Sequence, residues 1–150
     1  MTRGPCGLPR WGALLLVGLI GCGASAGPNE ASYVGSDFAF RGPDTLPPGP
    51  TIFRFKNAGT LDHELGLALL RPGVTAAQAF AAERDGAAVD SIYEADGLLY
   101  TPLGTEVDMG LTIDLQPGRN YVLICTLEDG PKETPHVKLG MFKGLVIRPR

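Results

Sequence analysis

Several features that would define a function are scarce or missing in this 150-residue chain. Lys and Arg number 13 against 16 Asp and Glu, and no basic cluster is present, which argues against nucleic-acid binding. The one long apolar run, Trp11–Ile20, covers about ten residues, whereas a membrane-spanning helix needs about 20. We find no internal repeat and no low-complexity block. Histidine occurs twice and cysteine three times, so each of these residues requires an explanation.

The N-terminus has the features of an export signal. Arg3 and Arg10 precede the apolar run, no acidic residue lies among the first ten, and small residues follow the run. The stretch Leu19-Ile20-Gly21-Cys22 resembles the lipobox of bacterial lipoproteins, in which the cysteine is lipidated and becomes the new N-terminus. The alternative is an ordinary signal peptide that is cleaved a few residues later.

The lipobox hypothesis divides the chain into three parts. We predict a signal peptide over 1–21, a short tether over 22–31 and one domain over 32–150. The protein would be exported and anchored to the periplasmic side of a bacterial membrane through lipidated Cys22. Cys6 leaves with the signal, so Cys125 is the only side-chain thiol of the folded domain. It cannot form an internal disulfide and needs another role.

The domain has the pattern of an all-β protein. Phe53 and Phe55 alternate with Arg54 and Lys56, which is the period of a half-buried strand. Similar patterns and turn residues predict strands over 32–40, 51–56, 63–69, 111–115, 120–126 and 144–148. Residues 41–50 are expected to be a turn region. The stretch over 87–110 should hold one or two short strands and a loop, but the pattern does not fix their boundaries. One short helix should begin after Thr75, which can form a capping box with Gln78. This helix should end near Gly86.

Four side chains carry the chemistry: His63, Cys125, His136 and Met141. Two imidazoles and a thiolate in a plane, with a weak axial thioether, are the ligand set of blue copper. Cys125 follows a strand, and the loop after it delivers the second histidine and the methionine. His63 comes from a distant segment and faces inward by parity with Leu65.

These motifs resemble those of the cupredoxins, the family of plastocyanin and azurin. The similar segments are Asn57–His63, Pro117–Cys125 and Pro135–Met141, which ends in His-x-x-x-Gly-Met. The resemblance implies a Greek-key β-sandwich that binds one copper ion. It assigns equatorial roles to His63, Cys125 and His136 and the axial role to Met141. The loop Thr126–Pro135 is longer than in small members of the family and is charged.

We therefore predict a lipid-anchored type 1 copper protein that transfers one electron between redox protein partners and is not an enzyme. Two other functions stay open: periplasmic copper storage or delivery, and a metal-free binding module on the same scaffold. Zinc also accepts one cysteine and two histidines. A cysteine nucleophile with a histidine base is disfavoured, because no nucleophile motif or oxyanion hole is recognisable.

Overall fold

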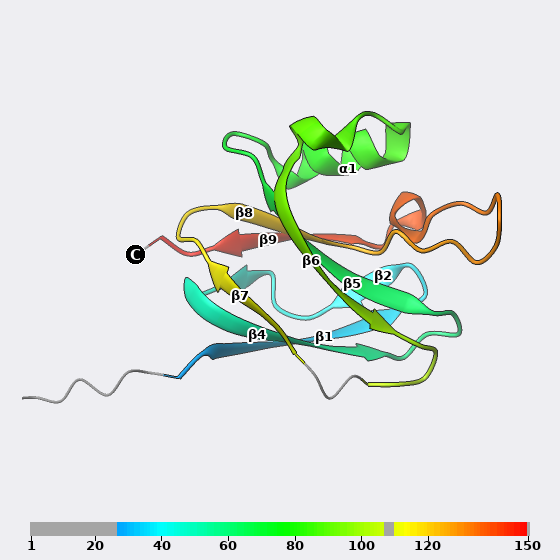
Figure 1. Cartoon of the computed structure of the whole chain (residues 1–150), viewed down its shortest axis with the longest axis horizontal. Coiled ribbons are helices and arrows are strands. Elements are labelled where there is room, and N and C mark those ends of the chain that lie inside the picture. Colours follow the sequence, from blue (N-terminus) through cyan, green and yellow to red (C-terminus); the bar gives the residue numbers. More distant parts are fainter. Residues whose placement is uncertain (1–26, 107–109, 150) are drawn as a thin grey trace, which may run out of the picture.

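The computed structural model describes residues 27–106 and 110–149, and within them nine strands form two packed sheets (Figure 1). The first sheet has the order β2-β1-β4-β7 and the second the order β3-β9-β8-β5-β6. Only β1–β4 and β3–β9 pair in parallel. The strands are β1 Asn29–Ser36, β2 Ala39–Arg41, β3 Thr45–Leu46, β4 Gly49–Asn57, β5 His63–Leu70, β6 Tyr93–Thr101, β7 Leu111–Leu115, β8 Asn120–Ile124 and β9 Phe142–Ile147. The predicted all-β sandwich with one short helix is confirmed.

The core lies between the two sheets, where the alternating side chains meet. Phe53 and Phe55 of β4 point inward and are fully buried, and Leu65 and Leu67 of β5 belong to the same cluster from the opposite sheet. Burial of each such side chain contributes about 1.5–3 kcal/mol. This alternation is the pattern that predicted the strands.

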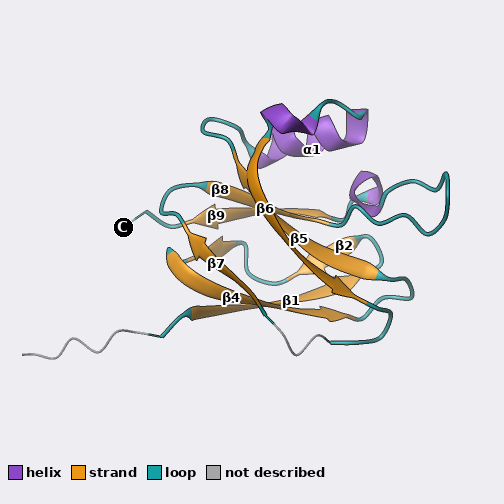
Figure 2. Ribbon diagram, viewed as in Figure 1, coloured by secondary structure: helices purple, strands orange, loops and turns teal. Residues whose placement is uncertain are grey.

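Strand β5 differs from the expectation of one covered face, because all of its residues are buried. It lies between β8 and β6, and helix α1, Ala76–Asp85, lies on the outer side of this sheet (Figure 2). Ala68 of the strand and Ala79 of the helix belong to this second apolar cluster. The helix thus helps to cover the outer face near the end of β5, and strand pairing on both sides makes β5 a central element of its sheet.

Some boundaries differ from the prediction. Strand β1 begins at Asn29 rather than at Ser32, because Asn29 pairs with Thr51 of β4. The predicted strand over 32–40 is divided into β1 and β2 by a turn at Asp37 and Phe38. The turn region over 41–50 contains the short strand β3, which was not predicted. The stretch over 87–110 contains one strand, β6, as expected, together with a short 3-10 helix, η1 Val89–Ser91. Both strands join a sheet through a distant partner, β9 or β5, which local sequence does not reveal.

Some predictions fall outside the described residues: the signal peptide, lipidated Cys22, the first half of the tether (22–26), and Met109. Within the described residues, no helix has both the length and the apolar character needed to cross a membrane.

The predicted capping box of α1 is present. The Thr75 hydroxyl accepts a hydrogen bond from the Gln78 backbone N–H, and the Gln78 side chain accepts one from the Thr75 N–H. Gly86 ends the helix in the left-handed conformation, with φ of 69°.

Replacing Thr75 by alanine should lower the free energy of unfolding by about 1 kcal/mol, because a helix N–H loses its acceptor. Chemical denaturation of the metal-free domain measures this change. Thr75→Ser is the control, since it keeps the hydroxyl and should lose only a fraction as much. Equal stability of Thr75→Ala and the parent would contradict the prediction.

Candidate metal centre

Strand pairing brings His63 and Cys125 to the same end of the sandwich. Strands β5 and β8 are antiparallel, with Gly66 opposite Ile124. The start of β5, where His63 lies, is therefore adjacent to the end of β8, which Cys125 follows directly. Both residues are fully buried.

The segment between β8 and β9 adds two more of the predicted residues. His136 begins the short 3-10 helix η2, His136–Leu139, and Met141 directly precedes β9. The Met141 backbone N–H donates to the His136 carbonyl at 3.0 Å, and the Met141 carbonyl accepts from the Cys125 N–H at 3.2 Å. Gly140 between them has φ of 112°, a conformation that favours glycine.

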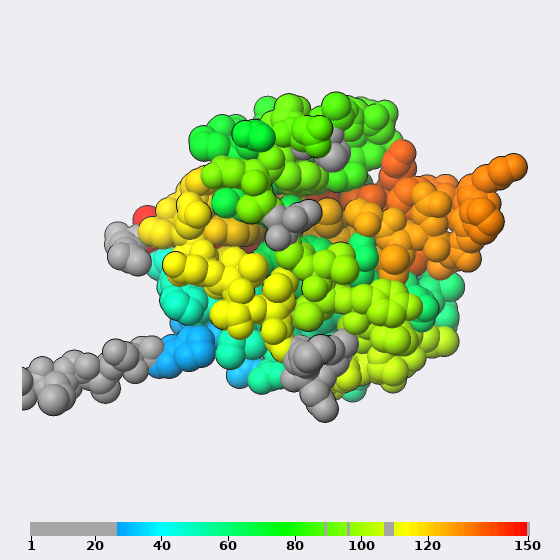
Figure 3. All heavy atoms as spheres, in the orientation of Figure 1, coloured from blue at the N-terminus to red at the C-terminus, as the bar shows by residue number. Residues whose placement is uncertain are grey.

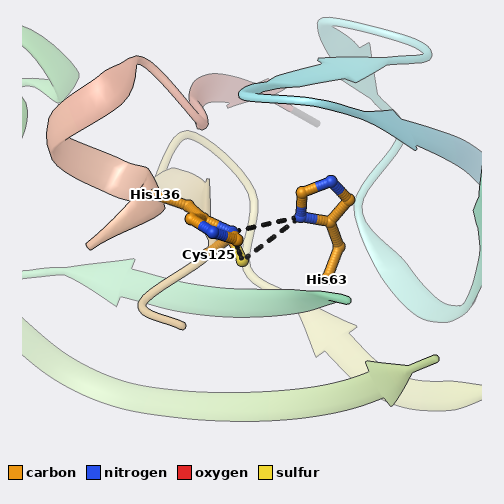
Figure 4. Close-up of side chains that lie close together, drawn as sticks. All are labelled: His63, Cys125 and His136. Atoms are coloured by element: carbon orange, nitrogen blue, oxygen red, sulfur yellow. Dashed lines mark hydrogen bonds between the residues drawn. The ribbon is translucent and has the colours of Figure 1, made fainter. Parts of the chain in front are cut away.

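Three predicted donor atoms converge in the interior (Figure 4). The Cys125 sulfur lies 3.5 Å from His136 Nδ1 and 4.0 Å from His63 Nδ1. The two Nδ1 atoms are 3.2 Å apart. Both rings therefore turn the same nitrogen toward the sulfur, and one ion could contact all three atoms with modest adjustment.

Met141 belongs to the same buried cluster as Cys125, and its side chain is fully enclosed. Its terminal methyl packs toward Gly35 of β1, where an added Cβ would lie 3.3 Å from it. The backbone bonds place Met141 beside both Cys125 and His136. Its axial role stays a prediction.

The outer nitrogen of each imidazole faces a carboxylate. His63 Nε2 lies 3.2 Å from Asp37 Oδ1, and His136 Nε2 lies 3.1 Å from Asp129 Oδ1. An ionised carboxylate can only accept a hydrogen bond, so each Nε2 carries the hydrogen. An imidazole with its one hydrogen on Nε2 has a lone pair on Nδ1, and both Nδ1 atoms point into the site.

These lone pairs provide a test of whether the residues fit a metal ion. Two Nδ1 acceptors 3.2 Å apart cannot satisfy each other, and the Cys125 thiol hydrogen can serve only one of them. A cation in contact with both nitrogens and the sulfur would satisfy all three. Two imidazoles and a thiolate are a donor set that suits copper, so the residues present fit this metal.

Burial determines the protonation of the free site. It raises the pKa of the Cys125 thiol to about 11, although backbone N–H groups oppose the shift. Burial also lowers the pKa of His63, against the opposing hydrogen bond to Asp37. The metal-free site at neutral pH therefore holds a thiol and a neutral His63, and metal binding must displace the thiol proton.

Glu64 holds the backbone behind the sulfur. Its backbone N–H donates to Cys125 Sγ at 3.5 Å, and its carboxylate accepts from the Thr126 N–H at 2.8 Å and from the Thr126 hydroxyl at 2.7 Å. Strand β5 thus supplies a metal-ligand candidate, His63, and the next residue fixes the start of the ligand loop.

The long loop Thr126–Pro135 extends away from the sandwich at this end (Figure 3). Glu64 holds its first residue, and near its far end the His136 N–H donates to the Leu127 carbonyl at 2.9 Å. Asp129 in the loop contacts His136. The extra length therefore projects outward while both ends stay bonded near the donor atoms.

Sequence reasoning missed three residues that contact the histidines. Asp37, Phe38 and Asp129 lie in turns or loops, where such residues are common and no spacing marks them. The Phe38 ring meets the His136 ring edge-on, with centroids 5.2 Å apart. The sequence offers only an indirect signal for them. A ligand histidine needs a hydrogen-bond partner for its second ring nitrogen, but the sequence does not identify that partner.

The fold and the convergent His-Cys-His cluster define a class: the chain has the cupredoxin fold. Auracyanin A, a "blue" copper protein from the green thermophilic photosynthetic bacterium Chloroflexus aurantiacus, is similar, with a TM-score of 0.50 and 21% identity. The match covers 81% of this chain and 100% of that chain. At this identity the similarity shows the fold alone.

Two further solved structures are similar with lower TM-scores. Auracyanin from Roseiflexus castenholzii is 16% identical, with a TM-score of 0.49, and the match covers 81% of this chain and 98% of that chain. Rusticyanin from Thiobacillus ferrooxidans is 16% identical, with a TM-score of 0.47, and the match covers 80% of this chain and 78% of that chain. No protein-family model and no curated protein sequence matches the chain.

Proposed function

We propose that this protein binds one copper ion through His63, Cys125 and His136 and carries one electron at a time. The observation that carries the proposal is the convergence of Nδ1, Nδ1 and Sγ within 4.8 Å in a fully buried site. Met141 is proposed as the weak fourth ligand. Blue copper in auracyanin A, on the same fold, supports this assignment.

The chemistry of this ligand set favours electron transfer over reactions on a substrate. Copper held by a thiolate and two imidazoles accepts and releases one electron between Cu(II) and Cu(I). The donor residues belong to strands and tight turns bonded to one another, so their positions resist change between the two states. His63, Cys125, His136 and Met141 are fully buried, which leaves no open position for a substrate among them. We infer that the protein is not an enzyme.

Burial also argues against copper delivery, the first alternative. Passing a metal to another protein requires ligands that a partner can reach, and the four proposed ligands are inaccessible. The chain has only two histidines and three methionines, so it offers few additional soft ligands for storage.

A copper titration of the domain from residue 23 tests the proposed function. Adding Cu(II) to the metal-free domain should give an intense blue charge-transfer band that saturates at one copper per chain. A colourless complex would show that the thiolate does not bind as proposed. Absence of binding would leave the metal-free scaffold as the remaining hypothesis.

Replacing Met141 by leucine should keep the blue band and raise the reduction potential, because loss of a weak axial donor disfavours Cu(II). Redox titration of the copper-loaded domain measures the shift. Met109→Leu is the control, since Met109 is the other thioether of the mature chain, and it should leave the potential unchanged. Loss of the band in Met141→Leu, or a shift of equal size in the control, would contradict the axial role.

We also propose that the protein is exported and held at the periplasmic face of a membrane by lipid on Cys22. The lipobox-like stretch Leu19–Cys22 supports this, and a tethered carrier could reach redox protein partners at the membrane. The partners are proposed only as a class, redox proteins.

Cys22→Ser should leave the protein unprocessed or release it from membranes, because serine cannot accept the lipid. Membrane fractionation with mass spectrometry of the N-terminus measures this. Cys6→Ser is the matched control and should leave processing and membrane association unchanged. A Cys22→Ser protein that is cleaved normally and stays with the membrane would contradict the anchor.

A further inference from the structure

Each of the two candidate ligand histidines, His63 and His136, forms a hydrogen bond through its outer nitrogen, Nε2, to an aspartate. His63 and His136 are fully buried, yet Asp37 and Asp129 keep 33% and 38% of their side-chain surface exposed. Each aspartate therefore lies between a buried ring and solvent. The two aspartates come from separate loops, one before β2 and one after β8.

We propose that Asp37 and Asp129 are positioning residues that hold both histidines with Nδ1 toward the Cys125 sulfur, and that their charges favour Cu(II) over Cu(I). This inference rests on the proposed copper function for its second half only. The first half concerns the metal-free protein.

The Asp37 carboxylate is fixed by its own partners. Its Oδ1 accepts from the Thr60 N–H at 2.8 Å, and its Oδ2 accepts from the Thr60 hydroxyl at 2.6 Å. Gly59 leaves room for the contact with His63: an added Cβ would lie 2.3 Å from Asp37 Oδ1 and 2.9 Å from His63 Nε2. The segment before His63 is thus shaped around this aspartate–histidine pair.

The turn that carries Asp37 contacts both histidines. The next residue, Phe38, packs on His136 and adopts φ of 62°, a conformation that costs a non-glycine residue about 1 kcal/mol or more. In this strained turn, Asp37 contacts the His63 ring and Phe38 contacts the His136 ring. Its geometry therefore matches a supporting role for the two ligand candidates.

Asp129 holds the second ring from the outer loop. Its contact with His136 Nε2 is the counterpart of the Asp37 contact with His63. Hydrogen bonds from carboxylates fix the orientation of ligand histidines and increase the basicity of the coordinating nitrogen. The two negative charges also interact more favourably with Cu(II) than with Cu(I), because the oxidised ion carries the larger positive charge.

The tautomer test uses the metal-free protein. Nitrogen-15 NMR of the two imidazoles should show hydrogen on Nε2 and a bare Nδ1 in both rings. Asp129→Asn keeps an acceptor oxygen without the charge, whereas Asp129→Ala removes the acceptor and should allow the other tautomer of His136. If Asp129→Ala leaves the His136 tautomer population unchanged, the positioning role of Asp129 is overturned.

The charge test uses the copper-loaded protein and a neighbouring carboxylate as the control. Asp62 lies near the site but accepts from the Tyr100 hydroxyl and the Leu103 N–H instead. Asp37→Asn and Asp129→Asn should each weaken Cu(II) binding about tenfold or more while affecting Cu(I) less. A tenfold difference between the two states raises the potential by about 59 mV. If the reduction potentials of Asp37→Asn and Asp129→Asn shift no more than that of Asp62→Asn, the charge effect is overturned.

Gly59→Ala tests the same contact without changing any ionisable group. The added methyl should push Asp37 away from His63. The reduction potential should then rise, and the tautomer of His63 with hydrogen on Nδ1 should become populated. Gly130→Ala is the control in the ligand loop, where the added Cβ meets its nearest neighbour, Glu133, at an ordinary 3.5 Å. Unchanged NMR and potential in Gly59→Ala, with the fold intact, overturn the role of Asp37.

The outcomes separate this inference from the proposed function. If the metal-free domain shows the predicted tautomers and their dependence on the aspartates, but binds no copper, the positioning role stands and the copper function fails. If copper binds with a blue band and the aspartate variants behave like Asp62→Asn, the copper function stands and the charge effect is overturned.

Discussion

Replacing Cys125 by serine is expected to abolish the blue charge-transfer band of the copper-loaded protein completely. The band requires a short, covalent bond between copper and a thiolate, and Cys125 is the only cysteine among the described residues. The two imidazoles would remain, with their Nδ1 atoms 3.2 Å apart. Residual copper binding should therefore be weak and colourless, which absorption spectra and a competition titration with a chelator measure.

The comparison with histidine variants makes this result specific. His63→Ala and His136→Ala should weaken binding or give a more open, differently coloured complex, because the thiolate remains. Circular dichroism of the metal-free variants shows whether each one folds. An intense blue band in folded Cys125→Ser would exclude Cys125 as the source of the colour and would contradict the proposed centre.

Replacing Phe55 by alanine should have the largest effect on stability, about 3–5 kcal/mol in the free energy of unfolding. Phe55 is fully buried in β4 and packs against Phe40, with ring centroids 5.9 Å apart. It also fills the space above Gly35, where an added Cβ would lie 2.6 Å from its ring. The neighbouring strands cannot collapse into the cavity without breaking their pairing, so most of the loss should persist.

Chemical denaturation of the metal-free domain measures this loss against two controls. Phe55→Leu keeps an apolar side chain and should lose clearly less. Lys56→Ala changes the exposed neighbour on the same strand and should stay within about 0.5 kcal/mol. A domain has about 5–15 kcal/mol of stability in total, so Phe55→Ala should approach unfolding. A loss below about 1 kcal/mol would contradict the assignment of Phe55 to the core.

Much of the fold could be predicted because its signals are local. The alternation around Phe53 and Phe55 depends only on the two-residue period of a strand, and the capping box at Thr75 spans one helical turn. Strand β3 was missed because its two residues are defined by pairing with β9, far along the chain. The second covered face of β5 was missed because the residues that cover it, including Ala79 of helix α1 and Val122 of β8, come from other parts of the chain.

The candidate site was predictable to the extent that its chemistry uses rare residues. The chain has only two histidines, and Cys125 is the one cysteine of the described residues, so the choice of His63, Cys125 and His136 needed no knowledge of the fold's details. Asp37 and Asp129 were not predictable, since the chain has 16 acidic residues, and most of those whose burial is described are exposed. Only spatial contact distinguishes these two from the others.

The sequence by itself determined that this protein is a β-sandwich with one helix and which scarce side chains are available as metal ligands. Those properties depend on residue type, short-range periodicity and scarcity. Only the tertiary structure decided that both imidazoles turn Nδ1 inward and that Asp37 and Asp129 lie behind them. Asp37 and His63 are 26 residues apart and meet only after β1 pairs with β4 and the two sheets pack. Contacts of this kind depend on the summed geometry of many strand pairings, which no local pattern encodes.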